Sequence, residues 1–474
     1  MAYSQNHQKP LWRMRATDKR VLLFIGDLLV TLIALLIALY FWAQGDAWLK
    51  FSWKFLNERV PTWFILLPAF WLILLIELYD MRRANSRRET LRGIALAAGI
   101  GMAIYLLIFF IAKDPLPRRG VAGFVLAASL FTLGWRSLYI NIFTAPQFMR
   151  RVLIVGAGRA GSTLVEQIHQ IWPPPFFVVG FIDDDPSKIG EDVEKVKVIG
   201  GGSDLLEIID RECISDLIFA ISGEMNSTMF NALLEARERG IEVSTFGSVY
   251  EELLGRVPIA LLQSDWILRS FVDQAHANAF FDLAKRLIDI LGGLIGTAGM
   301  LLILPFVALA TLIDSGFPLF YTQERLGMYG KPFKIYKFRT MVQNAEKDGH
   351  ARPAVENDER VTNVGRFLRR SHLDELPQFF FNVLKGDMSL VGPRSERPEL
   401  IEKFQLDIPF YRARLFVKPG LTGWAQVNFG YAWDVPTNTI KQEYDLYYIK
   451  HRTLLLDILI LIRTVSTVIG LKGQ

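Results

Sequence analysis

Cysteine is nearly absent from this chain, because Cys213 is the only one among 474 residues. An intramolecular disulfide and a thiolate metal cluster are therefore excluded. Charged residues are also scarce, at 21% against 51% hydrophobic residues, and this balance is more apolar than a soluble protein of this length requires. Part of the chain must therefore face lipid, and any part outside the cytoplasm must be held together by packing alone.

The charge that is present is slightly basic, with 53 Lys and Arg against 48 Asp and Glu. A basic balance suits anionic partners such as phosphates, lipid headgroups or nucleic acid. Charge alone does not choose among these partners. Because part of the chain must face lipid, we expect membrane lipids among its partners. We expect no nucleic-acid partner.

Long apolar runs fill the first third of the chain. Each is close to the ~20 residues that a membrane-spanning helix needs, and they are Val21 to Trp42, Trp63 to Tyr79, Ile94 to Ala112 and Val121 to Phe143. We predict a bundle of four transmembrane helices within residues 1–149. The first run is too long for the apolar part of a signal peptide, so we expect a retained anchor.

Basic residues set the orientation of these helices. They gather before the first run and between the second and third runs: Lys9, Arg13, Arg15, Lys19 and Arg20, then Arg82, Arg83, Arg87, Arg88 and Arg92. Both segments are therefore predicted to lie in the cytoplasm. Four crossings return the chain to the cytoplasm at Arg150. Asp27, Glu77 and Arg136 lie in or at the ends of the apolar runs, where an ionisable group is costly and is normally paired or turned toward a helix interface. A structural pairing role is favoured over a transport site.

A second region, residues 150–262, shows short β-rich runs separated by helical stretches. This alternation predicts an open parallel α/β sheet of Rossmann-like type. The runs are Val152 to Val155, Val178 to Asp183, Leu217 to Ile221 and Ile241 to Phe246. Residues 263–279 have no strong period and are predicted to be a linker to a third region, residues 280–474.

A glycine loop follows the first strand of this region. Gly156, Gly158 and Gly161 occupy the positions of a dinucleotide-binding loop, and Asp183 follows 22 residues after the last glycine, where such folds bind a ribose hydroxyl. They are candidate residues for a nucleotide cofactor. The alternative is that the glycines only permit the turn from strand to helix, and both readings stay open here.

The same region raises a competing function, a membrane-anchored nucleotide-sugar dehydratase or epimerase. Such an enzyme needs a Tyr-x-x-x-Lys pair to move protons, and no tyrosine of the chain has a lysine four residues later. The α/β region is also short for a complete enzyme of that kind. We therefore keep this function only as the alternative.

The third region contains an acidic pair, Asp374 and Glu375, among many cations. An acidic pair before a proline is often no more than a solvated turn or helix cap. Here six cations precede or follow it: Lys337, Arg339, Arg366, Arg369, Arg370 and Arg394. Because arginine and lysine bind phosphoryl oxygens, this combination suits a site for a pyrophosphate.

Several ordered motifs surround this pair. They are Lys285-Arg286 with Asp289, Gln323 to Gly327, Gly330 to Phe333, Lys337 to Met341, Leu373 to Gln378, Gly386 to Arg394 and Lys418 to Trp424. With these motifs the chain resembles, from about Phe280 to Gly470, the bacterial sugar transferase family of polyprenyl-phosphate hexose-1-phosphate transferases. The first two regions resemble the longer members of that family, which carry four helices and a Rossmann-like module.

The resemblance implies an activity. A UDP-hexose such as UDP-glucose or UDP-galactose would donate hexose-1-phosphate to undecaprenyl (polyprenyl) phosphate with release of UMP, as the initiating step of exopolysaccharide, capsule or O-antigen assembly. Asp374 would be the covalent nucleophile. Glu375 would lie beside Mg²⁺ and phosphate, as a metal ligand or a proton acceptor, and Asp374 is the other candidate metal ligand. Lys337, Arg339, Arg369 and Arg394 would bind the substrate phosphates.

The resemblance also implies a place in the cell and an assembly. The catalytic region would lie on the cytoplasmic face of the bacterial inner membrane, and the chain would form a homodimer. No motif reads the C2 or C4 substituent of the sugar, so the hexose stays open. A non-catalytic membrane scaffold is a further alternative, against which the intact Asp374-Glu375 pair argues.

The chain departs from the family pattern in two places. Residues 379–381 are three phenylalanines where the family has two residues. One extra helical residue rotates the next part of the helix by about 100°, so either a bulge absorbs it or Asn382 faces elsewhere. Ser395 replaces a usual proline, which predicts a looser loop around Arg394.

The third region is predicted to be mainly α-helical and monotopic. Leu287 to Ile313 is long enough to span a membrane, but a fifth crossing would separate the catalytic region from its cytosolic donor. We therefore predict a re-entrant helix that breaks at Pro305, with an ordinary kinked span as the alternative. Leu454 to Ile469 suits an interfacial helix, or else a buried core helix.

Overall fold

A computed structural model describes residues 16–45, 48–79, 81–111, 117–143, 149–172, 174–221, 223, 225–259, 261, 279–343, 358–430 and 434–469. The chain divides into two compact units, Met1–Val249 and Tyr250–Gln474. The first unit holds the helices of the first region and the α/β sheet. The second holds the whole of the third region, and each unit is considered by itself.

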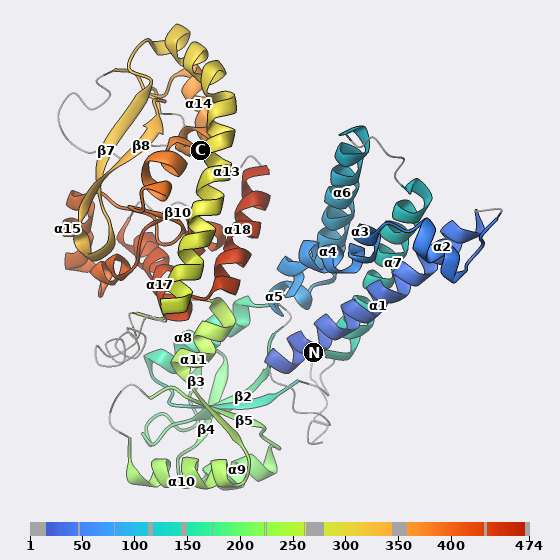
Figure 1. Cartoon of the computed structure of the whole chain (residues 1–474). Helices are drawn as coiled ribbons and strands as arrows, with labels where there is room; N and C mark the ends of the chain where they lie inside the picture. Colours follow the sequence, from blue (N-terminus) through green and yellow to red (C-terminus); the bar gives the residue numbers. More distant parts are fainter. Residues whose placement is uncertain are drawn as a thin grey trace. The chain divides into compact units, whose positions relative to one another are not determined.

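Three long helices form the first region of the first unit (Figure 1): α1 (Ala16–Gln44), α6 (Arg87–Ile111) and α7 (Arg118–Phe143). Each is long and apolar enough to cross a membrane. Small and aromatic side chains such as Ala34, Ala38, Phe124 and Ala128 pack between them. Membrane association of this region therefore agrees with the prediction for three of the four apolar runs.

The second apolar run, Trp63 to Tyr79, does not form the predicted continuous helix. It is divided into α3 (Thr62–Ile65), α4 (Leu67–Leu74) and the 3₁₀ helix η1 (Ile76–Tyr79). Pro68 lies in the first turn of α4, a position that proline favours because its missing N–H has no partner to lose there. The predicted continuous helix is therefore replaced at this run by three short helical segments in succession.

The expected pair of ionisable groups is present in the helical region. The Nη2 atom of Arg136 lies 2.7 Å from Oδ2 of Asp27, and both side chains are fully buried. Arg136 also donates through Nη1 to the carbonyl oxygen of Leu78, at 3.0 Å. These contacts join α1, η1 and α7, so the pair has the structural role that was predicted.

The α/β region forms a six-stranded sheet in the order β3-β4-β2-β1-β5-β6. Its strands are β1 (Arg151–Val155), β2 (Phe177–Ile182), β3 (Asp192–Val193), β4 (Val196–Gly200), β5 (Asp216–Phe219) and β6 (Glu242–Thr245). All neighbouring pairs are parallel except β3 with β4. The helices of this region are α8 (Arg159–Gln170), α9 (Leu205–Arg211), α10 (Ser227–Glu238) and α11 (Phe246–Leu254). The predicted parallel sheet is confirmed, with β4 and the short antiparallel edge as additions.

The second unit is a helical domain with two small sheets (Figure 1). A β hairpin of β7 (Phe320–Leu326) and β8 (Pro332–Phe338) pairs antiparallel, and β9 (Ser389–Val391) pairs parallel with β10 (Gly420–Thr422). The helices are α13 (Ala279–Ser315), α14 (Asn363–Arg370), α15 (Pro398–Asp407), α16 (Trp424–Asn428), α17 (Val435–His451) and α18 (Leu454–Ile469). Short turns η3 (Met328–Gly330), η4 (Leu373–Glu375), η5 (Phe379–Leu384) and η6 (Tyr411–Phe416) connect them.

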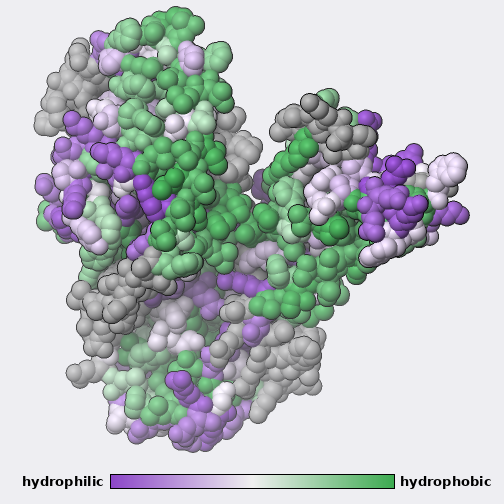
Figure 2. Space-filling model, viewed as in Figure 1, coloured by the Kyte–Doolittle hydropathy of each residue, from purple (hydrophilic) through white to green (hydrophobic). Residues whose placement is uncertain are grey.

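Helix α13 is continuous over 37 residues, with Pro305 inside it. The predicted helix break at Pro305 is therefore absent. The helix contacts its own domain near both ends, since Asp289 accepts from the Leu390 amide and Asp314 accepts from the Val364 amide. The other side of α13 carries exposed apolar side chains such as Leu291, Leu302, Phe306 and Ile313, and hydrophobic residues follow the helix in Figure 2.

Helix α18 turns its charged residues inward. Asp457 is 2% exposed and accepts from Lys285, and Arg463 is 5% exposed and donates to Asn428. Ile460 is fully buried in the core of the domain, whereas Leu455 is 69% exposed. One face of α18 is therefore a core face, and the other presents apolar side chains to the surroundings.

Candidate active site

The acidic pair lies on η4, a single turn that follows α14. Thr362 caps α14 by accepting from the Gly365 amide, and the helix ends at Arg370. His372 then adopts a left-handed conformation with φ 57°, which is uncommon for a residue with a side chain and marks a constrained turn. This turn aims the carboxylates of Asp374 and Glu375 toward β8 and the loop after β9.

Glu375 is held by two cations. Lys337 on β8 donates to Oε1 of Glu375 at 2.5 Å, and Nη2 of Arg394 donates to the same oxygen at 2.9 Å. Burial alone would raise the pKa of Glu375, but the charges of Lys337 and Arg394 outweigh it and hold that pKa well below its usual range. Glu375 is therefore ionised and fixed in place.

The hydrogen bonding and the pKa of the Asp374 carboxylate differ from those of Glu375. Its side chain is only 7% exposed, yet within the described ranges no hydrogen bond reaches its carboxylate. Burial raises the pKa of Asp374, and the charge of Glu375 adds to that rise. Lys337, Arg369 and Arg394 act in the opposite direction. A buried carboxylate near three cations is available to a reacting group.

The six cations named from the sequence do not all lie at the acidic pair. Lys337, Arg369 and Arg394 come together at the acidic pair, and Arg369 is oriented by a hydrogen bond from its Nε to Oγ1 of Thr340, at 2.8 Å. Arg366 and Arg370 are exposed on α14. Half of the predicted set therefore forms the centre.

Arg339, a predicted phosphate ligand, is used elsewhere. Its side chain is 7% exposed, and Nη2 donates to the carbonyl oxygens of Ser315 and Gly316. These contacts join the end of β8 to the end of α13. Arg339 thus holds the scaffold of the site, and its direct binding of phosphate is not supported by this placement.

The extra phenylalanine is absorbed by a π-helix. Residues Phe379–Leu384 form this wider turn, which accommodates one additional residue without rotating the residues beyond it. Asn382 is fully buried, accepts from the Tyr336 amide at 3.3 Å and donates to the Lys334 carbonyl oxygen at 2.7 Å. The expected bulge is confirmed, and Asn382 fixes the strand that carries Lys337.

In the α/β region, two of the three glycines have a backbone explanation. Gly156 has φ +111°, and a Cβ atom on Gly161 would lie 2.1 Å from the carbonyl oxygen of Gly156. Oδ2 of Asp183 accepts from the Ala157 amide at 2.8 Å and lies 3.1 Å from Nζ of Lys188. A Cβ atom on Gly158 would meet open space. Asp183 holds the loop itself, which favours the structural alternative for these residues.

Two supporting residues, Thr340 and His372, were missed from the sequence, and for Asn382 the sequence left two directions open. Thr340, His372 and Asn382 act on the site through Arg369, through the turn and through β8. The period-two pattern on either side of Gly327 to Gly330 is typical of a hairpin and could have predicted β7 and β8. No local pattern marks His372 or Thr340, because their roles depend on contacts made across the fold.

Comparison with known proteins assigns the family. The family model for bacterial sugar transferases matches residues 280–471, and the model for a CoA-binding domain matches residues 74–245. A "UDP-glucose:undecaprenyl-phosphate glucose-1-phosphate transferase" of Caulobacter vibrioides is 40% identical over 191 residues, 40% of this chain and 70% of that protein. The chain belongs to the bacterial sugar transferase family, as predicted.

Two further relatives agree with this assignment. A "UDP-N-acetylgalactosamine-undecaprenyl-phosphate N-acetylgalactosaminephosphotransferase" of Aeromonas hydrophila is 41% identical over 229 residues, 48% of this chain and 52% of the relative. A "UDP-glucose:undecaprenyl-phosphate glucose-1-phosphate transferase" of Xanthomonas campestris pv. campestris is 38% identical over 224 residues, 47% of this chain and 44% of the relative. The chain spans about half the length of these two relatives. All three relatives bear the names of phosphotransferases, the predicted enzyme class.

Proposed function

We propose that this protein transfers a hexose-1-phosphate from a UDP-hexose to undecaprenyl phosphate and releases UMP. The observation that carries the proposal is the buried Asp374 carboxylate, which lies among Lys337, Arg369 and Arg394 and accepts no hydrogen bond within the described part of the chain. The names of the family relatives supply the two substrates. Their different sugars, glucose and N-acetylgalactosamine, leave the hexose to be measured.

In the first half-reaction, a carboxylate oxygen of Asp374 attacks the β-phosphorus of the UDP-sugar. The bond from that phosphorus to the oxygen it shares with the α-phosphorus breaks, and UMP leaves with the electron pair. The attacking carboxylate and the diphosphate are both anionic, so the three cations are needed to reduce their repulsion. The second pKa of a phosphate monoester, about 6, makes UMP a good leaving group at neutral pH.

In the second half-reaction, an oxygen of undecaprenyl phosphate attacks the same phosphorus. The acyl phosphate bond breaks, the Asp374 carboxylate is restored, and the sugar is left on a lipid diphosphate. Two separate steps allow a water-soluble donor and a membrane acceptor to use one site in turn. One phosphoanhydride is broken and one is formed, so the overall transfer is readily reversible.

Glu375 fits the role of a fixed charge better than that of a proton acceptor. Its pKa is held low by Lys337 and Arg394, and a carboxylate of low pKa is a weak base. Its Oε1 atom instead contacts two cations, Lys337 and Arg394, and sets their positions. We propose that Glu375 orients Lys337 and Arg394 toward the diphosphate.

Magnesium is the expected cofactor. Among the described residues no cluster of three or more His, Cys, Asp or Glu side chains forms a complete protein site. Mg²⁺ at phosphate sites is usually held by one or two carboxylates together with water and substrate phosphates, and Asp374 with Glu375 would provide these two carboxylates. When bound, the metal ion would neutralise negative charge on the diphosphate.

The contacts of α13 bear on how the catalytic domain meets the membrane. Near its start Lys285 donates to the Val391 carbonyl oxygen, and at its end Arg339 binds Ser315. A helix that enters and leaves the bilayer on one side needs a bend, and Pro305, which cannot donate a backbone hydrogen bond, is the position within α13 where the membrane could induce one. We propose a re-entrant α13 with the catalytic domain on the cytoplasmic face of the inner membrane, in a homodimer as expected for the longer family members.

Cysteine labelling tests this topology in a Cys213→Ser background. Single cysteines at Ala279 and Thr322 should both react with a membrane-impermeant reagent from the cytoplasmic side of inverted vesicles. Reaction of the two positions from opposite sides would establish a span and overturn the re-entrant arrangement. Chemical cross-linking of the same vesicles reports the dimer.

Release of UMP tests the proposed activity. Purified full-length protein with Mg²⁺ should release UMP from at least one sugar in a panel of UDP-glucose, UDP-galactose and their N-acetylated forms, and undecaprenyl phosphate should sustain turnover. Asp374→Asn should abolish both. A dehydratase or epimerase would change the sugar without releasing UMP, and a scaffold would do neither.

A further inference from the structure

The loop that carries Arg394 is fixed through its backbone. Residues 392–396 lie between β9 and α15, and four successive carbonyl oxygens accept hydrogen bonds. The donors are the Gly420 amide to Pro393, Nη2 of Arg414 to Arg394, Nη1 of Arg325 to Ser395, and the Leu326 amide to Glu396. Two of the four donors are arginine side chains, which require partners of their own to stay in place.

Glu396 supplies a partner to both arginines. Its Oε2 lies 3.8 Å from Nη1 of Arg325, and its Oε1 lies 3.7 Å from Nη1 of Arg414. Lys441 on α17 makes the closest contact, 2.6 Å to Oε1. Asp445 holds the other side of the Arg414 guanidinium, at 2.6 Å. A single carboxylate therefore connects three cations, two of which bind the loop.

This cluster is buried and ionised. The Glu396 side chain is 12% exposed and that of Arg414 is 2% exposed. Burial alone would raise the pKa of Glu396, but Lys441 and Arg414 outweigh it and lower that pKa to about 2. Removing one member of such a cluster leaves the others uncompensated in a poorly solvated place.

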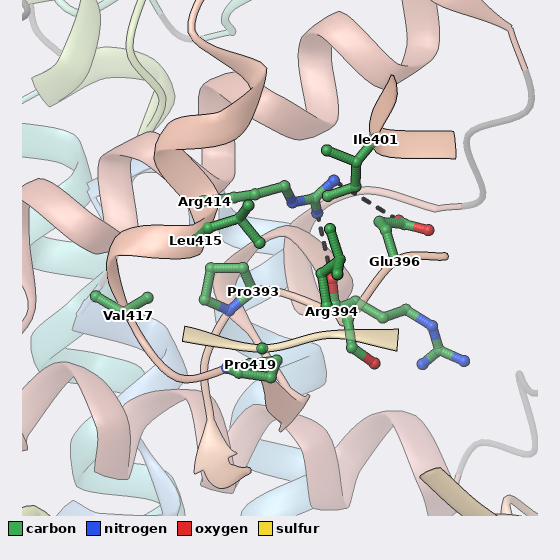
Figure 3. A pocket seen from close by; sticks show the side chains of 11 residues that line it. Pro393, Arg394, Glu396, Ile401, Arg414, Leu415, Val417 and Pro419 are labelled. Atoms are coloured by element: carbon green, nitrogen blue, oxygen red, sulfur yellow. Dashed lines mark hydrogen bonds and ion pairs between the residues drawn. The ribbon is translucent and has the colours of Figure 1, made fainter. Parts of the chain in front are cut away.

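Figure 3 shows the direction of the side chains around this loop. Arg414 reaches toward Glu396 and toward the carbonyl oxygen of Arg394, whereas the Arg394 side chain points away from both. The backbone of Arg394 is thus held from one side while its guanidinium reaches Glu375 on the other. Ser395, which predicted a looser loop, is restrained through its carbonyl oxygen by Arg325.

We propose that Glu396 is a positioning residue for Arg394: it holds Arg325 and Arg414, and they hold the loop that aims Arg394 at Glu375 and the diphosphate. The inference rests on the proposed function in one respect, namely that Arg394 binds the diphosphate of the donor.

A double-mutant cycle tests the inference. Glu396→Gln should lower kcat/KM for UMP release by about ten-fold, mainly through a higher KM for the UDP-sugar, because Arg394 is then held less firmly toward the diphosphate. In an Arg394→Ala background the same change should have little further effect, below about two-fold. Glu399→Gln is the matched control, since Glu399 is exposed on the first turn of α15, and it should leave kcat/KM unchanged.

Two outcomes would overturn the inference: wild-type kcat/KM in Glu396→Gln, or effects of Glu396→Gln and Arg394→Ala that multiply fully in the double variant. If Glu396→Gln does not fold, Lys441→Met is used in its place with the same criteria, because it removes one partner and leaves the carboxylate. If the wild-type protein releases no UMP, the proposed function fails. The positioning role is then decided by binding of Mg²⁺ and UDP, which Glu396→Gln should weaken only while Arg394 is present.

Discussion

Lys337→Ala is the perturbation that tests the electrostatics of the acidic pair most sharply. Lys337 lies 2.5 Å from Glu375 and its side chain is 19% exposed. Its positive charge lowers the pKa of Asp374 and that of Glu375. Removing this charge must therefore raise both pKa values, so that a higher pH is needed to ionise the nucleophile.

The size of the shift depends on the charges that remain. A unit charge about 4 Å away contributes ~4 kcal/mol at an effective dielectric constant of about 20, and ~1.4 kcal/mol corresponds to one pKa unit. Arg369 and Arg394 still act on Asp374 in the variant, and water enters the space left by the lysine. We therefore expect the shift to be reduced to about one pH unit.

The assay is the initial rate of UMP release from pH 5 to 9 without lipid acceptor. The acidic limb of the profile should move to higher pH by about one unit in Lys337→Ala, in addition to any uniform loss of rate. Lys334→Ala is the control, because Lys334 is exposed on the same strand, and its limb should stay in place. An unmoved limb in Lys337→Ala, or an equal movement in the control, would refute the electrostatic reasoning.

Three further predictions concern stability, each measured as the melting temperature of the purified protein in detergent. Asn382→Ala leaves buried backbone groups of Tyr336 and Lys334 unpaired and should cost about 2–3 kcal/mol; an unchanged melting temperature would exclude this role. Asp27→Asn leaves Arg136 uncompensated and should cost about 3–5 kcal/mol, more than the exposed control Asp18→Asn. Burial raises the pKa of Glu443 to about 7, so its protonated form favours folding at low pH and this stability is lost as pH rises from about 4.5 through 7. Glu443→Gln should therefore be less pH-dependent than wild type, and identical profiles would contradict this.

The sequence was sufficient for the elements that depend on local pattern. Short β-rich runs between helical stretches predicted β1, β2, β5 and β6, and ordered motifs predicted the family and the acidic pair. The Asp27–Arg136 pair was predicted because an unpaired charge in an apolar helix is costly. For the extra phenylalanine the sequence left two outcomes open, a bulge or a different direction of Asn382, and the π-helix is the first of these.

The features that the sequence missed depend on contacts between distant segments. The run Trp63 to Tyr79 is apolar except for Glu77, yet it is divided into short helices, and Pro68 lies in the first turn of one of them. Conversely, Pro305 does not end α13, because tertiary contacts on both sides of the proline hold the helix along its domain. Hydropathy does not distinguish these two prolines.

The positions of the Lys and Arg side chains around the acidic pair also depend on contacts that the sequence does not reveal. The resemblance assigned Arg369 to phosphate binding and left Arg366 and Arg370 unassigned. The fold gives the reason, because Arg369 is turned inward by Thr340 while the other two are exposed. Arg339 was assigned to substrate from its place in a motif and instead binds the end of α13. Glu396 was not predicted from the sequence. Its role depends on contacts with residues of other segments, namely Arg325, Leu326, Arg414 and Lys441.

The covalent intermediate on Asp374 is the central claim, and intact-protein mass spectrometry tests it most directly. Wild-type protein incubated with Mg²⁺ and a UDP-hexose, without lipid acceptor and quenched in acid, should gain the mass of one hexose phosphate, and peptide mapping should place it on Asp374. The added mass should disappear when undecaprenyl phosphate is supplied. UMP release with no added mass on the protein, or the same added mass in Asp374→Asn, would contradict the mechanism.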